Sequence, residues 1–146
     1  MAAEFPFLAD ASTPEEIRAL DGEKMDAWYA LQTARADLFK AVTDDQYTDA
    51  ARRAIASLEA NQDIWDELVA YRDTGRPLYK VPQLVWLKFK DEVTAKTDLE
   101  LPDMLASLRS QMSQNKDNPD KVKTLTRKKE YVEAEIERRR AAAAAQ

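Results

Sequence analysis

The stretch ARRAIASLEANQDIWDELVAYRDTG, residues 51–75, decides the fold class of this chain. Its apolar side chains recur three, four or seven positions apart, a spacing that places them on one face of an α-helix. Gly75 then supplies the residue type that often follows the last turn of a helix. The stretch therefore predicts a long amphipathic α-helix, whose stripe contains Ala51, Ile55, Leu58, Trp65 and Leu68.

The residues before this helix predict two more helices. Thr13 and Pro14 form a typical helix start, with threonine as the N-cap and proline in the first turn, and predict a short helix to about Leu20. Beyond Gly22, a second apolar stripe predicts a helix up to about residue 42, and its members are Met25, Trp28, Leu31, Leu38 and Val42. We expect the tryptophans to lie in the core: Trp28, Trp65 and Trp86.

The residues after this helix contain one ambiguity and a predicted hairpin. Residues 84–90 alternate in a way that suits a strand, but a lone strand would have no partner, so we expect a helix from Pro82 to about Thr94. Two further apolar stripes flank a short polar connector and predict a C-terminal antiparallel helical hairpin over residues 101–140. An alanine tail follows at residues 141–146.

Together these elements predict an all-α fold, a bundle of about five or six helices that ends in a long antiparallel helical hairpin. A chain of 146 residues suits one domain, so we predict a single helical domain over residues 1–146. Residues 1–12 precede the first helix signal and contain Pro6, which argues against helix there. We therefore expect these residues to form an extended leader.

The chain lacks both cysteine and histidine, and their absence excludes several classes of site. It leaves no cysteine nucleophile, no histidine general base and no thiolate or imidazole ligand for a metal. Two isolated glycines also leave no glycine-rich phosphate loop. Asp63 and Glu67 lie four residues apart and could chelate a cation, but we favour a solvated helix face. We expect no enzyme, no catalytic residue, no metal, no cofactor and no small-molecule substrate.

The sequence carries no signal that directs it to a membrane or out of the cell. The N-terminus lacks the basic and apolar regions of a secretion signal, and no stretch approaches the roughly 18 apolar residues of a membrane span. The absence of cysteine fits a reducing compartment. We expect no membrane partner and a cytoplasmic or intracellular location, including incorporation into a virion.

Charge is distributed unevenly along the chain. Residues 1–75 have a net charge of -9, whereas residues 116–146 have a net charge of +3. An acidic front and a basic tail attract each other, either within one molecule or between copies. The pattern leaves both arrangements open.

The last predicted helix contains a candidate contact face. Arg127, Tyr131 and Arg138 fall together on a helical wheel, on a face distinct from the apolar stripe, and Arg139 extends this set. A basic face with one aromatic residue suits nucleic-acid phosphates and a stacked base. Glutamates interleave with these residues and would repel phosphates, so we favour a solvated or protein-facing helix over a nucleic-acid site.

The apolar leader is a second candidate for partner binding. Phe5, Phe7 and Leu8 precede the first helix cap and form a small apolar cluster. They either fold back as a lid on the core of their own chain or dock in a groove of another subunit, as short anchored peptides do. The sequence favours neither arrangement.

These features predict a non-enzymatic structural or assembly protein that acts through helix faces and its apolar leader. We expect a protein partner or a homo-oligomer, and a small bacteriophage virion or assembly component fits this profile. Two alternatives remain open. One is a nucleic-acid-binding accessory protein that uses the basic C-terminal helix, and the other is a regulatory adaptor of one partner protein.

Overall fold

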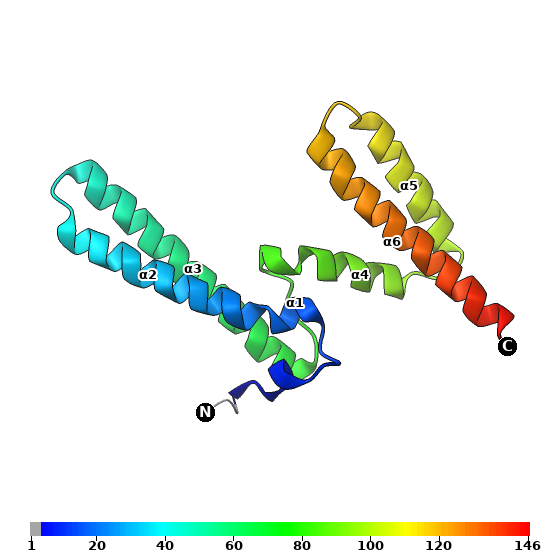
Figure 1. Cartoon of the computed structure of the whole chain (residues 1–146), viewed down its shortest axis with the longest axis horizontal. Coiled ribbons are helices and arrows are strands. Elements are labelled where there is room, and N and C mark those ends of the chain that lie inside the picture. Colours follow the sequence, from blue (N-terminus) through cyan, green and yellow to red (C-terminus); the bar gives the residue numbers. More distant parts are fainter. Residues whose placement is uncertain (1–3) are drawn as a thin grey trace. The chain divides into compact units, whose positions relative to one another are not determined.

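A computed structural model describes residues 4–146, and Figure 1 shows them as helices joined by turns. No strand occurs among these residues, so the predicted all-α class is confirmed. The chain divides into two compact units, Met1–Leu87 and Lys88–Gln146, and the predicted single domain over 1–146 stays a prediction. With η for a short 3-10 helix, the elements are η2 (Pro6–Ala9), α1 (Glu15–Arg18), α2 (Leu20–Lys40), α3 (Asp44–Thr74), η3 (Pro82–Leu84), α4 (Val85–Ala95), α5 (Glu100–Gln114) and α6 (Pro119–Ala144).

The ambiguous residues 84–90 are helical. Pro82 occupies the first turn of η3, where a missing N–H costs no hydrogen bond, and α4 continues directly from η3. Leu84 and Leu87 are both buried, three residues apart, as one face of a helix requires. The buried residues of this segment therefore follow the spacing of a helix and not the alternation of a strand.

The core of the first unit collects buried side chains from the leader, α1, α3 and the segment around η3. The leader is not extended, because Pro6–Ala9 forms a 3-10 helix with Pro6 in its first turn. A proline in that turn needs no hydrogen-bond acceptor for its nitrogen, which is why Pro6 starts this helix and does not prevent it. Residues 1–3 of the predicted leader lie outside the described residues. The buried core is Phe5, Ile17, Leu20, Ile64, Leu68, Val81, Leu84 and Leu87.

Thr13 joins the leader to α1 in a different way from the predicted cap. The N-cap of α1 is Pro14, and Thr13 is buried. The Thr13 hydroxyl donates a hydrogen bond of 2.9 Å to the carbonyl oxygen of Phe7. Thr13 therefore holds the leader against the start of α1 through this hydrogen bond and does not cap α1.

Helices α2 and α3 lie side by side as a hairpin, which Figure 1 shows in cyan and blue-green. A capping box starts α3, because Thr43 accepts from the Gln46 N–H and the Gln46 side chain accepts from the Thr43 N–H. Between residues 21 and 63 the buried side chains are Ala34 and Ala50. The distal part of the hairpin is therefore held by a seam of small residues.

This seam corrects the prediction for Trp28 and Val42. Trp28 is 46% exposed and Val42 is 90% exposed, so neither lies in a core. Trp65 and Trp86 are half-buried. On a helical wheel Trp28 lies about 120° from Ala34, the buried residue of α2 in the α2–α3 interface, so its side chain lies outside that interface.

The loop after α3 is organised by one buried carboxylate. Glu67 is fully buried and accepts hydrogen bonds from the backbone N–H groups of Leu78 (2.7 Å), Tyr79 (3.2 Å) and Lys80. The predicted solvated face at Asp63 and Glu67 is therefore wrong for Glu67, which binds the backbone of its own chain. The sequence spacing could not reveal this, because the three donors lie 11 to 13 residues away.

The second unit contains most of α4 together with α5 and α6, and the last two helices lie side by side. Residues 115–118 connect α5 to α6, where Asn118 caps α6 and Pro119 occupies its first turn. The buried apolar side chains are Phe89, Val93, Leu101, Leu108, Leu125 and Val132. The alanine tail continues α6 as exposed helix up to Ala144.

Replacing Glu67 with alanine should destabilise the first unit. The substitution removes the acceptor of three backbone N–H groups, two of which belong to the exposed residues Leu78 and Lys80 and can bond to water instead, so we expect a loss of about 1–3 kcal/mol. Urea unfolding followed by tryptophan fluorescence measures this unit specifically, because every tryptophan precedes residue 88. The matched control is Glu59→Ala at an exposed position of α3, which should change the unfolding free energy by less than about 0.5 kcal/mol. Equal effects of the two substitutions would contradict this role of Glu67.

Candidate functional site

The structure places the predicted leader anchors against the core of their own unit. Phe5 is buried, and its ring centroid lies 5.2 Å from that of Trp65 in an edge-to-face arrangement. The Phe7 ring lies 4.9 Å from the ring of Tyr71, and Leu8 is half-buried. This is the lid arrangement, one of the two that the sequence left open. Their use as anchors for another subunit stays a prediction that no contact supports.

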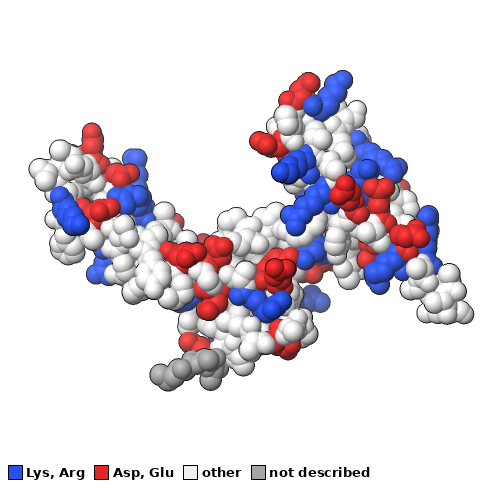
Figure 2. Space-filling view, in the orientation of Figure 1, with Lys and Arg blue, Asp and Glu red and all other residues white. Residues whose placement is uncertain are grey.

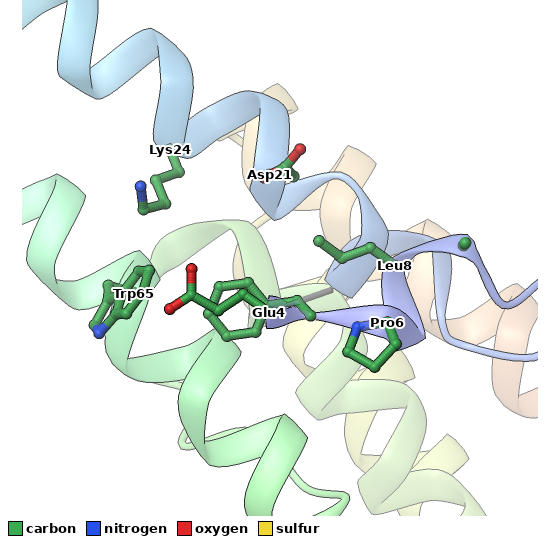
Figure 3. Close-up of a pocket in the computed structure, with 8 residues that line it drawn as sticks. Glu4, Pro6, Leu8, Asp21, Lys24 and Trp65 are labelled. Atoms are coloured by element: carbon green, nitrogen blue, oxygen red, sulfur yellow. The ribbon is translucent and has the colours of Figure 1, made fainter. Parts of the chain in front are cut away.

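A shallow pocket of about 420 Å³ lies between the leader and the hairpin. Figure 3 shows Glu4, Lys24 and Trp65 turned toward this space, with Asp21 and Leu8 farther along its wall. The Lys24 ammonium lies 5.3 Å from the centroid of the Trp65 ring, a cation–π contact. The lining thus combines one ammonium, two carboxylates and two aromatic side chains, without a hydroxyl or thiol that could act as a nucleophile.

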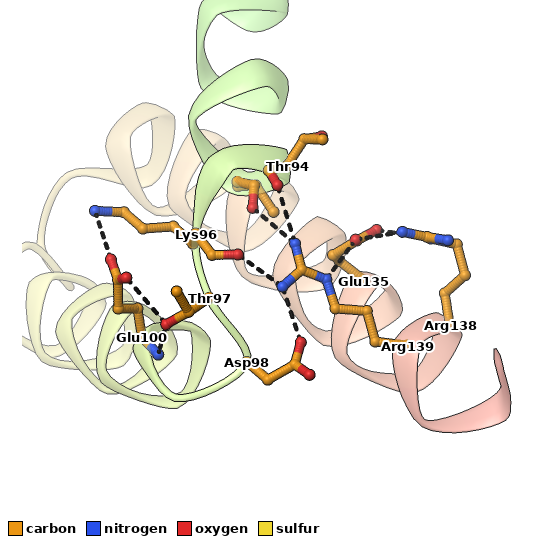
Figure 4. Close-up of polar contacts among 9 residues, drawn as sticks. Thr94, Lys96, Thr97, Asp98, Glu100, Glu135, Arg138 and Arg139 are labelled. Carbon is orange, nitrogen blue, oxygen red and sulfur yellow. Dashed lines mark hydrogen bonds and ion pairs between the residues drawn. The ribbon is translucent and has the colours of Figure 1, made fainter. Parts of the chain in front are cut away.

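Arg139 holds the C-terminal end of α4 in the second unit (Figure 4). Its guanidinium donates to the carbonyl oxygens of Lys96 (2.7 Å), Thr94 (3.2 Å) and Val93 (3.3 Å). Val93 and Thr94 lie in the last turn of α4, whose carbonyls lack the N–H partners that a continuing helix would supply, and Lys96 follows that turn. A cation at this position is also favoured by the helix dipole. Arg139 therefore acts as a cap, supplied by α6, for a helix more than 40 residues earlier in the chain.

Two carboxylates complete the arginine cluster of Figure 4. Arg139 donates to Asp98 (2.9 Å) and to Glu135 (2.8 Å), and Arg138 donates to both oxygens of Glu135. The hydrogen bonds from Arg138, with those from Arg139, lower the pKa of Glu135 to about 2, although burial opposes this shift. The buried carboxylate thus stays ionised and orients both arginines.

The remaining predicted contact residues on α6 have different environments. Arg127 is exposed, while Tyr131 is half-buried with its ring 6.1 Å from that of Phe89. The ammonium of Lys128 lies 5.2 Å from the same Phe89 ring. Two residues of the predicted contact face therefore have contacts within the second unit, because Tyr131 packs on α4 and Arg139 caps α4.

Charges of both signs mix on the surface of α5 and α6. Figure 2 shows Lys and Arg side chains beside Asp and Glu side chains over these helices. Ion pairs such as Lys129–Glu133 (3.3 Å) and Arg109–Glu133 (3.8 Å) neutralise part of the basic tail. The face that this figure shows lacks the single-sign surface that attracts a phosphate backbone.

Sequence reasoning missed the most unusual surface, which we call the hairpin face. It consists of large apolar side chains of α2 and α3 that are exposed to between 46% and 90%: Trp28, Tyr29, Phe39, Tyr47, Ile55 and Leu58. A signal for it exists in the alanine spacing, because Ala27, Ala34 and Ala41 recur every seven residues and mark the seam of α2. Reading that seam as the inner side would have placed the large apolar residues outside.

No family model, curated protein or solved structure matches this chain. Within residues 4–146, no group of three or more acidic side chains is arranged to hold a metal ion. None of the helices in this range is long and apolar enough to cross a lipid bilayer.

The two neighbouring arginines of α6 provide a matched test of the helix cap. Arg139→Ala removes the donors from the end of α4, so we expect the Lys96 amide, which donates to the Val93 carbonyl, to exchange its hydrogen at least about tenfold faster. Arg138→Ala removes a mostly exposed side chain that donates to Glu135 and not to the carbonyls of α4, so it should leave that rate nearly unchanged. Hydrogen exchange resolved by residue measures both. Similar exchange in the two variants would show that Arg139 does not cap α4.

The ionised state of Glu135 predicts a pH dependence. Because its folded-state pKa of about 2 lies below the ordinary value of 4.5, Glu135 stabilises the fold above pH 4.5. This contribution is lost as the pH falls from 4.5 towards 2. The variant Glu135→Gln lacks it at every pH, so the difference in melting temperature between wild type and variant should shrink across this window. Thermal unfolding followed by circular dichroism measures the difference, and a constant difference would contradict the prediction.

Proposed function

We propose that this protein is a structural or assembly component that works by presenting the hairpin face to another protein. The observation that carries the proposal is the distribution of side chains along residues 21–63. The buried side chains there are Ala34 and Ala50, with Leu31 and Leu38 half-buried, while the six large apolar side chains of the hairpin face are exposed. This arrangement suits a surface that is completed by a partner.

The physical reason is the cost of leaving apolar area in water. Burying it is worth about 25 cal/mol per Å². An exposed apolar patch of several hundred Å² on a folded protein usually marks an interaction site. A helix also needs a second layer on its apolar stripe, and the alanine seam between α2 and α3 does not cover these stripes. A protein partner supplies that layer.

The alternatives have less support from the described residues. A nucleic-acid site on α6 would use Arg138 and Arg139, which are bound to Glu135, and Tyr131, whose ring packs on Phe89. A regulatory adaptor would use the same hairpin face and would differ in the copy number of its complex. A small helical subunit with an apolar face also fits the profile of a virion component, and we include that role in this proposal.

The test compares complexes formed by two variants of the full chain. Leu58→Glu places a charge on the hairpin face, whereas Ala30→Glu places the same charge on an exposed position of α2 away from that face. Wild-type protein purified from its native cells should elute as a complex heavier than one 16.6 kDa chain. The Leu58→Glu variant should lose that complex and Ala30→Glu should keep it. Single chains in all three preparations would contradict the proposal.

A further inference from the structure

We infer that the partner of the hairpin face is the hairpin face of a second copy of this chain, in a two-fold symmetric dimer. This inference rests on the proposed function, because it names the occupant of the same surface. Two hairpins packed face to face would form four helices around a shared apolar layer, an arrangement with many stable examples.

Each helix of the hairpin contributes one uncharged stripe. On α2 the stripe follows steps of three, four and seven residues through Met25, Trp28, Gln32 and Phe39. On α3 it follows steps of four, three and four through Ala51, Ile55, Leu58 and Gln62. These are the steps by which one helix packs along another. Each stripe therefore has the pattern of a helix–helix interface.

Both stripes lie on the same side of the hairpin. The ion pair between Arg53 and Asp37, with a distance of 3.0 Å, joins α3 to α2 and marks one side. On a helical wheel of 100° per residue, each stripe is centred roughly 150–170° away from the bridging residue of its own helix. The two stripes consequently form one continuous surface, on the side opposite the Arg53–Asp37 bridge.

The area of this surface is of the size that a dimer needs. Aromatic side chains each contain about 150–250 Å², and the three on the stripe side of the hairpin, Trp28, Tyr47 and Phe39, are exposed to 46%, 59% and 90%, so together they present on the order of 400 Å². Met25, Ile55 and Leu58 are also about half exposed and add to this area. A standard interface takes about 800 Å² from each partner. The hairpin face approaches that value with large apolar groups alone.

The absence of charge in the stripes favours a second copy over a partner of another kind. In a two-fold contact each residue lies near residues of the same patch, so a patch of one charge sign would repel itself. Residues 21–63 contain nine acidic and five basic side chains, of which Asp21 and Arg35 border the α2 stripe, while the named members of both stripes are uncharged. The excess negative charge of the hairpin thus lies outside the surface that would contact the same surface of a second copy.

The first experiment measures the mass of the full chain in solution by sedimentation. We expect about twice 16.6 kDa at micromolar concentration, and the same mass in 1 M salt, because an apolar contact is not screened. Leu58→Glu should weaken association at least tenfold, and Ala30→Glu should leave it unchanged. A wild-type monomer at all concentrations, or association that disappears in high salt, would overturn the inference.

The second experiment tests the symmetry by cross-linking, and it exploits the absence of cysteine. Gln32→Cys places a single thiol near the middle of the hairpin face, and Thr33→Cys places one on the other side of α2. A short bis-maleimide should join two Gln32→Cys chains efficiently and two Thr33→Cys chains at background level. Equal yields for both variants would overturn the inference. A monomeric wild type whose Leu58→Glu variant loses a different protein would also refute self-pairing while leaving the proposed function intact.

Discussion

The close approach of α2 and α3 through alanine is the constraint on which the rest of the first unit depends. The fully buried side chains where the two helices meet are Ala34 and Ala50, and Leu31 and Leu38 of α2 lie half-buried on the same face as Ala34. Large apolar residues such as Trp28, Phe39 and Leu58 lie outside this narrow seam and are exposed. The seam that joins the distal hairpin and the exposed hairpin face are therefore two sides of the same side-chain arrangement.

In each of the two units, one buried carboxylate holds a segment of the chain in place. Glu67 gathers the backbone N–H groups of the loop that leads from α3 to η3, and Glu135 orients the arginine that caps α4. In both places an acidic side chain leaves water only because several donors converge on it, as burial of a charge requires. Carboxylates in this protein are therefore parts of the scaffold, and they bind the chain's own backbone and arginines.

Local sequence signals predicted the elements well and their tertiary roles poorly. Gly75, Pro82 and Pro119 mark helix boundaries through backbone constraints that act within a few residues, and the structure places boundaries beside each of them. Trp28 was assigned to a core because apolar spacing identifies a stripe without saying which of two stripes faces inward. The roles of Glu67 and Arg139 within the fold could not be predicted for a related reason. Their partners lie 11 to 46 residues away, and no periodic pattern encodes such distances.

The position of Arg139 has a consequence for how the chain folds as it leaves the ribosome. The contacts that form the core of the first unit all lie within the first 87 residues, so this unit can assemble once those residues have left the ribosome. The end of α4, in contrast, must wait for an arginine that is translated 43 residues after Lys96. Until then its carbonyls bond to water and its last turn frays. Synthesis therefore imposes an order on the two units, and the hairpin face emerges while the second unit is still incomplete.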